Sequence, residues 1–265
     1  MSISPQRACV LVFAGSDPSG GAGIQADLQA IAAQGAHALT VITAMTVQDN
    51  DRVHAVYPVA PDVIVRQAQA LIDKIPVAAI KLGIVGSLAN AQAIAGVIRE
   101  LKQRQPQLPV VLDTVLGSGH GDALAVENAV RVIAPLLEVA TLITPNLPEA
   151  GLLCPDAATP LQQAQQLLRQ TCTDVLLKGG HGSGALVSNL WLNRLQTDRW
   201  RQEWQWPRLP GEFHGSGCTL ASAIAGQLAL GRSMEHALDM AQAYCGQALA
   251  NAYAIAAGQL IPART

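Results

Sequence analysis

The sequence predicts an α/β protein with a mostly parallel, doubly wound sheet covered by helices on both faces. Short apolar, β-branched runs alternate with longer runs of helical periodicity along most of the 265 residues. Half of the residues are hydrophobic but only 3% are aromatic, which suits helices of small aliphatic residues packed closely on a buried sheet. No Ser/Gly linker or sustained repeat interrupts the sequence, so we expect residues 1–265 to form one domain.

The N-terminal part of the chain predicts two buried strands, a helix and an edge element. Residues 9–13 are a continuous apolar run and predict a strand, and residues 24–34 have helical spacing that ends at Gly35, a typical C-cap residue. Residues 39–43 are β-branched and predict a second strand. Residues 53–59 carry charge, which is typical of an edge strand or a flap.

The same alternation continues to the C-terminus. We expect helices at 62–74, 88–103, 126–136 and 161–169, and strands at 78–82, 110–112, 141–144 and 175–177. An antiparallel pair at 185–191 and 199–206 follows, and helices at 218–230 and 234–257 close the chain. The pair contains all four tryptophans, residues 191, 200, 204 and 206, whose partial alternation predicts a packed face rather than a surface for a nucleobase.

Composition and charge exclude several classes of protein. A net charge of −2 provides no basic surface of the kind that binds nucleic acid or anionic membranes. Five cysteines, an odd number without a C-x-x-C pair, argue against disulfides or a zinc site and for a reducing compartment. The first residues lack the cationic start of a signal peptide, and no run reaches the ~18 apolar residues of a membrane span. We therefore expect a cytoplasmic protein.

The strongest local signal is the turn His214-Gly215-Ser216-Gly217-Cys218-Thr219, which opens a predicted helix. Its small residues let backbone N–H groups converge on an anion, and the helix N-terminus adds a partial positive charge. Cys218 lies in the first turn of that helix, where this field favours the thiolate over the thiol. The pattern alone fits equally well a glycine-containing helix start with a structural cysteine, because short glycine patterns are common.

A second glycine-rich loop follows the first predicted strand. Four glycines lie between residues 15 and 23, and Asp27 follows one turn inside the next helix. Residues 21–26 match a loose Rossmann pattern, but they begin several residues beyond the strand, whereas the dinucleotide fingerprint starts in the tight turn itself. Four glycines with a nearby carboxylate favour a ligand-binding loop over an ordinary turn in which Asp17 acts as a local cap.

Polar residues follow three further strands at their carboxyl ends, where ligands of such sheets bind. A carboxylate at Glu149 suits Mg²⁺ bound through water, but a helix cap formed by Asn146 and Glu149 explains the pattern more simply. Lys178 could contact a phosphate, or it could be an ordinary lysine on the protein surface. Asp113, taken alone, fits a solvated acid at a strand end.

The order of these motifs resembles that of one family. The chain carries Gly15-Ser16-Asp17-Pro18-Ser19-Gly20-Gly21-Ala22-Gly23, Lys81-Leu82-Gly83, Leu112-Asp113-Thr114, Thr144-Pro145-Asn146-Leu147-Pro148-Glu149, Leu177-Lys178-Gly179-Gly180-His181 and the turn at 214–219. From about residue 8 to about residue 250, the series resembles the hydroxymethylpyrimidine/phosphomethylpyrimidine kinases of thiamine biosynthesis, a branch of the ribokinase-like superfamily.

The resemblance implies a ribokinase-like three-layer α/β/α sandwich with a mostly parallel central sheet and a small antiparallel addition. It implies a homodimer that uses ATP and Mg²⁺ to phosphorylate 4-amino-5-hydroxymethyl-2-methylpyrimidine and then its monophosphate. The implied pyrimidine-binding residues are Gly15, Asp27, Gln48, Gly83 and Ile84; those for the metal are Asp113 and Glu149; those for ATP are Asn146, Lys178 and Thr219. Gly215, Ser216 and Gly217 would form the anion hole, and Cys218 would occupy the catalytic position, where sugar kinases carry an aspartate base.

Two segments depart from the family pattern. Between Val115 and Asp122 the family commonly has Met and Ser, often with Lys or Thr ahead of the Ser, whereas here Leu-Gly-Ser-Gly-His-Gly contains no lysine. Residues 210–213 lack the polar residues expected before His214. These differences affect the expected phosphate contacts and loop closure, and therefore the efficiency of the second phosphorylation.

Three other functions stay open at the level of sequence. A pyridoxal-type kinase, or a kinase that accepts both alcohols, would use the same chemistry, although Gln48 and Cys218 favour the pyrimidine. A non-catalytic pyrimidine-binding regulator would not need Asp113, Glu149 and Lys178. A Rossmann oxidoreductase fits the placement of the glycines poorly.

Overall fold

The computed structural model describes residues 6–171, 173–195 and 201–265. Within them, nine strands form one sheet in the order β3-β2-β1-β4-β5-β6-β7-β8-β9. The strands are β1 (Cys9–Ser16), β2 (His37–Gln48), β3 (Val53–Pro58), β4 (Ala79–Leu82), β5 (Val110–Leu112), β6 (Leu142–Ile143), β7 (Asp174–Leu177), β8 (Leu186–Asn193) and β9 (Arg201–Pro207). The helices are α1 (Gly23–Ala33), α2 (Pro61–Ile72), α3 (Leu88–Arg104), α4 (Ala129–Leu137), α5 (Leu147–Leu153), α6 (Pro160–Gln170), α7 (Ser216–Ala229) and α8 (Met234–Ala250).

The sheet is parallel at its centre and antiparallel at both edges. β1 pairs in parallel with β2 and β4, and the parallel ladder continues through β5, β6 and β7. β3 pairs antiparallel with β2 at one edge, and β8 and β9 add two antiparallel strands at the other. The predicted edge strand at 53–59 and the antiparallel pair at 185–191 and 199–206 are therefore confirmed, although residues 199 and 200 lie outside the described residues.

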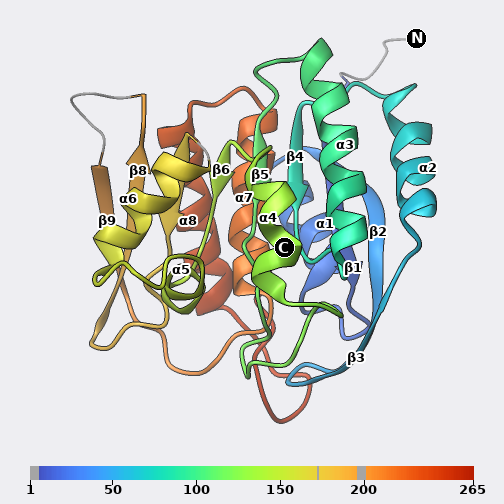
Figure 1. Ribbon diagram of the computed structural model, residues 1–265. Helices are drawn as coiled ribbons and strands as arrows, with labels where there is room; N and C mark the ends of the chain where they lie inside the picture. Colours follow the sequence, from blue (N-terminus) through green and yellow to red (C-terminus); the bar gives the residue numbers. More distant parts are fainter. Residues whose placement is uncertain (1–5, 172, 196–200) are drawn as a thin grey trace.

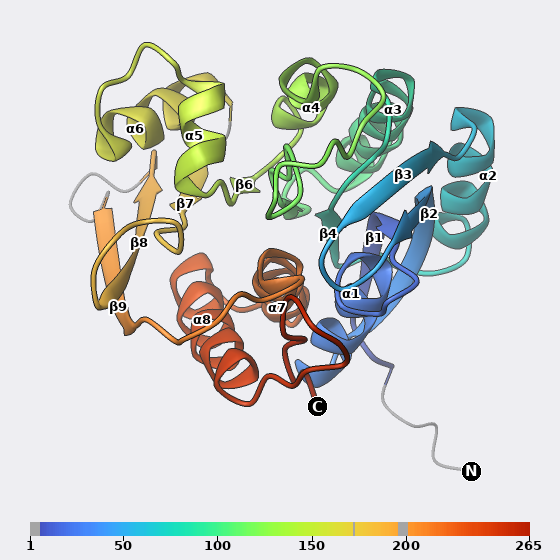
Figure 2. The same ribbon diagram turned by 90° about the horizontal axis from the view of Figure 1, so that it is seen from below.

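Side chains of the central strands alternate between two hydrophobic cores, and this explains why helices cover both faces of the sheet. Leu11 and Phe13 of β1 belong to the core under α2–α6, whereas Val10 and Val12 belong to the core under α1, α7 and α8. Figure 2 shows the two helix layers on either side of the sheet. The predicted three-layer α/β/α architecture is confirmed.

The structure corrects the boundaries of three predicted elements. The strand expected at 39–43 extends over His37–Gln48, and the helix expected at 126–136 begins only at Ala129. The helix expected at 234–257 ends at Ala250, and the residues beyond it fold back so that Leu260 pairs with Phe213. Backbone pairing with another segment therefore outweighs the helix propensity of this alanine-rich stretch.

Two of the tryptophans pack against each other, as predicted. Trp191 is 1% exposed, and its ring centroid lies 6.4 Å from that of Trp204. Trp206 instead lines a cavity, and Trp200 lies outside the described residues. The tryptophan cluster therefore serves mainly to close the β8–β9 edge of the core.

Two expectations concern the chemistry of the chain as a whole. The cysteines in the described residues are free thiols, which agrees with the absence of a disulfide pattern, and Cys172 lies outside those residues. No helix in the described part of the chain is long and apolar enough to cross a membrane.

Candidate active site

The carboxyl ends of the parallel strands meet at one edge of the sheet, the lower edge in Figure 1. The loops that follow them enclose a cavity of about 670 Å³. The predicted site residues that line it are Gly15, Gln48, Gly83, Ile84, Asp113, Asn146, Glu149, Lys178, Gly215, Ser216, Gly217 and Cys218. Two others, Asp27 and Thr219, have fully buried side chains and do not line the cavity.

α7 begins in a turn that glycine fits and other residues do not. Gly215, its N-cap, has a φ of +79°, and a Cβ there would clash with the carbonyl oxygen of Gly21. The N–H groups of Ser216, Gly217 and Cys218 are the first of the helix and have no acceptor within it. Together with the helix dipole, these donors provide a binding site for an anion at the cavity wall.

An acid and a cation lie directly beside this helix end. Lys178 Nζ contacts Asp113 Oδ1 at 2.9 Å, and a Cβ added to Gly217 would lie 3.2 Å from Asp113 Oδ2 and 3.3 Å from Lys178 Nζ. Burial alone would lower the pKa of Lys178, but the charges of Asp113 and Glu149 raise it above its usual value. Lys178 is therefore a cation poised at the same anion site.

Asn146 and Glu149 cap α5 and also line the cavity. The Asn146 side chain accepts from the Glu149 N–H at 2.9 Å, and the Glu149 carboxylate accepts from the Asn146 N–H at 2.8 Å. The capping interpretation is confirmed, and it does not exclude a ligand role. Burial, aided by the charge of Asp113 and opposed by Lys178, raises the pKa of Glu149 to about 7. A cation beside this carboxylate would favour its ionised form.

The donor set around Asp113 fits Mg²⁺. Asp113 Oδ2 is buried and makes no hydrogen bond, and the Glu149 carboxylate is close enough to feel its charge. Mg²⁺ binds through one or two carboxylates and completes its shell with water and phosphate oxygens. The described residues hold no group of three or more His, Cys, Asp or Glu side chains that could bind a metal without such additional ligands. The two carboxylates therefore suit an ion that arrives with a phosphate.

A buried ion pair lies beneath the cavity wall, close enough to Asp113 to feel its charge. Lys81 Nζ and Asp27 Oδ1 are 2.7 Å apart with both side chains fully buried, and the Ser222 hydroxyl donates to the same oxygen at 2.6 Å. Burial alone would lower the pKa of Lys81, but the charge of Asp27 raises it above its usual value. Asp27, expected in the pyrimidine pocket, thus contacts Lys81, and Lys81 is the residue that lines the cavity. The sequence signal for Lys81 is a lone charge within an apolar strand.

Cys218 lies close to this pair, and its predicted ionisation is wrong for the free protein. Burial raises the pKa of the Cys218 thiol to about 11, although the charge of Lys81 and a hydrogen bond from the Gly23 N–H act in the opposite direction. The free energy needed to bury a thiolate away from water is larger here than the stabilisation of that thiolate by the helix N-terminus and Lys81. The thiol is therefore protonated at neutral pH.

Four of the five pyrimidine-site residues suggested by the sequence, all except Asp27, line the cavity. A Cβ on Gly15 would lie 2.7 Å from Ile84 Cδ1, and a Cβ on Gly83 would lie 3.0 Å from Lys81 Nζ. Both glycines therefore lie so close to a neighbouring side chain that an added Cβ would force that side chain to move. Gln48 lines the cavity at the end of β2.

The two glycine turns are tied together through Asp17. His214 Nε2 lies 2.8 Å from Asp17 Oδ2, and the same carboxylate accepts from the backbone N–H groups of Ser19 and Ala22. Burial alone would raise the pKa of Asp17, but the hydrogen bonds from His214, Ser19 and Ala22 hold it below its usual value. Asp17 is thus more than a local cap: it fixes the first turn against the second.

Three segments that form another part of the cavity wall are here called the lid: residues 49–53, residues 116–122 and Gln259. Arg52 Nε and Nη2 donate to the carboxylate of Asp122 at 3.0 and 2.5 Å, and His120 Nε2 lies 3.1 Å from Asp51 Oδ1. A Cβ on Gly119 would lie 2.7 Å from the side-chain nitrogen of Gln259. The loop at 116–122 has no lysine, and a cation reaches it from Arg52 instead.

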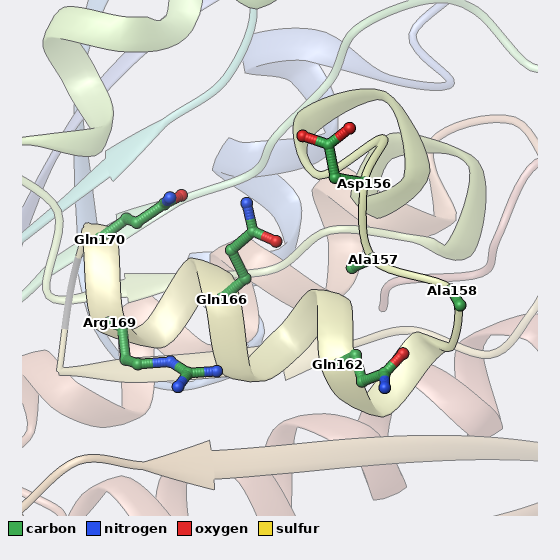
Figure 3. A pocket seen from close by; sticks show the side chains of 7 residues that line it. All are labelled: Asp156, Ala157, Ala158, Gln162, Gln166, Arg169 and Gln170. Atoms are coloured by element: carbon green, nitrogen blue, oxygen red, sulfur yellow. The ribbon is translucent and has the colours of Figure 1, made fainter.

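A second hollow of about 530 Å³ lies on the outer surface at α6 (Figure 3). Five of its seven lining residues have polar side chains, and all seven come from α6 and the segment before it: Asp156, Ala157, Ala158, Gln162, Gln166, Arg169 and Gln170. None of the motifs described above contributes to it. The chemistry is therefore concentrated at the strand ends.

Comparisons with known proteins show which family the chain is similar to. A family model described as phosphomethylpyrimidine kinase matches residues 17–262. The chain is 38% identical over 261 residues to the hydroxymethylpyrimidine/phosphomethylpyrimidine kinase of Salmonella typhimurium, covering 96% of this chain and 95% of that protein. It is 34% identical over 255 residues, 94% of this chain, to a thiamine biosynthesis multifunctional protein of Corynebacterium efficiens, of which it spans 34%.

The fold has a solved counterpart with a bound small molecule. The structure of the pyridoxal kinase from Staphylococcus aureus in complex with pyridoxal superposes with a TM-score of 0.84 at 25% identity. It covers 98% of this chain and 94% of that one.

Proposed function

Because the chain belongs to the phosphomethylpyrimidine kinase family, we propose that it phosphorylates 4-amino-5-hydroxymethyl-2-methylpyrimidine with ATP, and then phosphorylates the resulting monophosphate. The observation that carries the proposal is the convergence of Asp113, Lys178 and the N-terminus of α7 at Gly217. Phosphoryl transfer is catalysed mainly by positioning and by donors placed where negative charge develops, and this convergence supplies both.

The residues divide the work as follows. The N–H groups of Ser216, Gly217 and Cys218 and the ammonium of Lys178 hold the transferring phosphoryl group. Asp113 and Glu149 would hold Mg²⁺, which when bound neutralises phosphate charge. Thr219, which was expected to bind ATP, instead supports the helix start, since its hydroxyl donates to the Gly215 carbonyl at 2.8 Å.

The alcohol is held at the other end of the cavity, beside Gly15, Gln48, Gly83 and Ile84. The Cys218 thiol orients the substrate hydroxyl. Its thiolate form accepts the hydroxyl proton as the new bond to phosphorus forms and the bond from that phosphorus to ADP breaks. A pKa of about 11 makes Cys218 a protonated group at rest, so its contribution as a base is modest. In the second step the nucleophile is a phosphate oxygen that is already ionised, and it needs no base.

Several finer features belong to the same proposal. We infer that residues 1–265 act as one kinase domain, that Mg²⁺ is the metal, that the enzyme works in the cytoplasm, and that it is a homodimer. The family resemblance supports the dimer, and the pattern of unpaired cysteines supports a reducing compartment.

Pyridoxal kinase activity is the second candidate, alone or beside the first. It is favoured by the similarity to the pyridoxal-bound kinase of S. aureus. A non-catalytic pyrimidine-binding regulator is disfavoured, because Asp113, Glu149 and Lys178 form a phosphate site that a pure binder would not need.

One assay panel tests the proposal. The purified protein is incubated with Mg·ATP and the pyrimidine alcohol, its monophosphate, or pyridoxal, and the products are identified by mass. We expect both pyrimidine products. ATP use only with pyridoxal would establish the second candidate, and no product with any of the three would refute a kinase function.

A further inference from the structure

The last residues of the chain form part of the site's support. After α8 ends at Ala250, the chain folds back so that the His214 N–H donates to the Leu260 carbonyl at 2.9 Å and the Ala263 N–H donates to Ala248 at 2.9 Å. Figure 2 shows this terminal segment, in red, running beside α7 and α1. It carries Arg264 to the back of the anion site.

Arg264 is 2% exposed and links three elements. Its Nε donates to the Thr219 hydroxyl at 2.8 Å, its Nη2 donates to the Gly21 carbonyl, and its Nη1 lies 3.5 Å from Gln29 Oε1 in α1. A Cβ on Gly215 would lie 2.9 Å from Nη2, so the guanidinium is directly behind the N-cap of α7. The backbone of Arg264 is itself held in place, because the Tyr244 hydroxyl donates to the Arg264 carbonyl at 2.8 Å.

The charge of Arg264 has no local counter-ion. All three acceptors of its guanidinium are neutral oxygens, and no carboxylate within the described residues forms an ion pair with it. Asp27 is the one carboxylate among the described groups whose charge acts on it, and Asp27 is engaged by Lys81. Burial lowers the pKa of Arg264 from its usual value, but arginine stays protonated at all physiological pH values. An unpaired buried cation is costly, which calls for a function that uses it.

We propose that Arg264 is a positioning residue for the anion hole: it clamps Gly21 and Thr219 so that the first N–H groups of α7 stay aimed at the transferring phosphoryl group, and its charge reinforces theirs. The clamp works through two contacts, because Thr219 in turn donates to the Gly215 carbonyl and Gly21 packs against Gly215. The inference rests on the proposed kinase function.

The test compares Arg264→Met and Arg264→Lys with a matched control, Lys102→Met. Lys102 is a partly buried cation that donates to the Val139 carbonyl at 2.8 Å, and neither residue lines the cavity. Direct anion-hole donors are worth about 10²–10³ in kcat, so we expect a loss of about tenfold to hundredfold for Arg264→Met, less for Arg264→Lys, and none for Lys102→Met. The KM for each substrate should change less than about threefold, because the clamp acts on the transition state.

Two further measurements distinguish positioning of the anion-hole N–H groups from general stabilisation of the fold. Methylguanidinium added to Arg264→Ala should restore part of the lost kcat. Binding of ADP with aluminium fluoride, which mimics the transferring phosphoryl group, should weaken about tenfold more than binding of ADP alone in Arg264→Met. The second measurement needs no pyrimidine, so a parent protein that binds the mimic but phosphorylates nothing would refute the proposed function and leave the clamp standing.

The proposal is overturned if Arg264→Met keeps kcat within about twofold of the parent. It is equally overturned if ADP and the aluminium fluoride complex weaken by the same factor, because the arginine would then only stabilise the fold.

Discussion

The lid of the cavity and a second part of its wall, here called the floor (residues 17–23 and 214–219 with Lys81, Asp113, Asn146, Glu149 and Lys178), use ion pairs of different kinds. In the floor, Lys81–Asp27 is fully buried, and Lys178–Asp113 is only 14% and 1% exposed. In the lid, the Arg52 side chain is 53% exposed although its partner Asp122 is only 12% exposed, and the partners of the His120–Asp51 pair are 34% and 37% exposed. Buried pairs hold their geometry at a high cost if broken, whereas exposed pairs open easily and are screened by salt.

The difference teaches which half of the site is preorganised. The donors for phosphoryl transfer lie in the floor, where catalysis requires fixed positions. The lid must open to admit two substrates and release two products, and weak contacts suit that task. Variants of the two halves should therefore separate stability from turnover.

The largest effect is expected from the buried pair of the floor. Lys81→Met leaves Asp27 as an unpaired buried acid and should destabilise the protein by about 3–5 kcal/mol, measured by urea unfolding. The double variant Lys81→Met, Asp27→Leu should recover much of this loss, because it removes both charges. A double variant that is less stable than the single one would show that the pair itself stabilises the fold.

Gly215→Ala should nearly abolish catalysis. The new methyl group meets the Gly21 carbonyl at a φ of +79°, so the first N–H groups of α7 must move, and we expect kcat to fall about 10²–10³-fold. The control is Gly96→Ala in the middle of α3, where no atom lies within 4 Å of the added Cβ. That change should stabilise the protein by about 1 kcal/mol and leave kcat unaltered.

Glu149 should give the floor a characteristic pH dependence. Its pKa is about 7 in the folded protein against 4.5 for the free side chain, so the folded state binds the proton more tightly. The stability it provides is complete below pH 4.5 and is lost as pH rises to about 7, a change of about 3 kcal/mol. Glu149→Gln should flatten urea-unfolding stability across this window; an unchanged slope would show that another group titrates.

Substitution of Cys218 tests how much proton transfer contributes to the rate of phosphorylation. We expect Cys218→Ala to slow the first phosphorylation about tenfold and the second by less, because only the first must remove a proton from an alcohol. Steady-state rates with the alcohol and with the monophosphate, measured on one preparation, check this. Equal losses in both steps would mean that Cys218 only positions the substrate.

Much of the floor could be predicted from the sequence because its residues follow strands directly. Asp113, Asn146 and Lys178 come at carboxyl ends, and parallel strands bring those ends together. The glycine turn at 214–219 could be predicted for a different reason, because a helix start is marked by a local sequence pattern. Strand–helix alternation, a property of short segments, likewise predicted the layers of the fold.

The remainder depends on contacts between distant segments. The inward direction of Asp27, its partner Lys81 and the burial that raises the Cys218 pKa all arise when α1 and α7 pack on the sheet. Arg264 follows residues 251–257, whose composition predicts helix. The chain folds back there instead, because Leu260 pairs with Phe213, and local sequence does not predict that pairing. The lid was recognised only as a departure from a family pattern, because its cation comes from Arg52, outside the loop.

The smallest effect is expected in the lid. Arg52→Gln removes the contacts to Asp122 but should leave the urea midpoint unchanged, because the Arg52 side chain is half exposed and Asp122 keeps its hydrogen bond from the Val53 N–H. It should lower kcat/KM a few-fold, more for the monophosphate than for the alcohol, since closure over a second phosphate depends on this loop. The kcat/KM of the parent should fall towards that of Arg52→Gln as salt rises from 0.1 to 1 M, because the Debye length falls from ~10 to ~3 Å.

The matched control for the lid is Arg99→Gln, which breaks a pair with Glu138 between α3 and α4; the Arg99 side chain is 52% exposed, close to the 53% of Arg52. It should change neither kcat/KM nor its salt dependence. If both variants behave alike, the Arg52–Asp122 pair plays no part in closure. If Arg52→Gln instead lowers the urea midpoint as far as Lys81→Met does, the lid is as rigid as the floor, and product release must use another path.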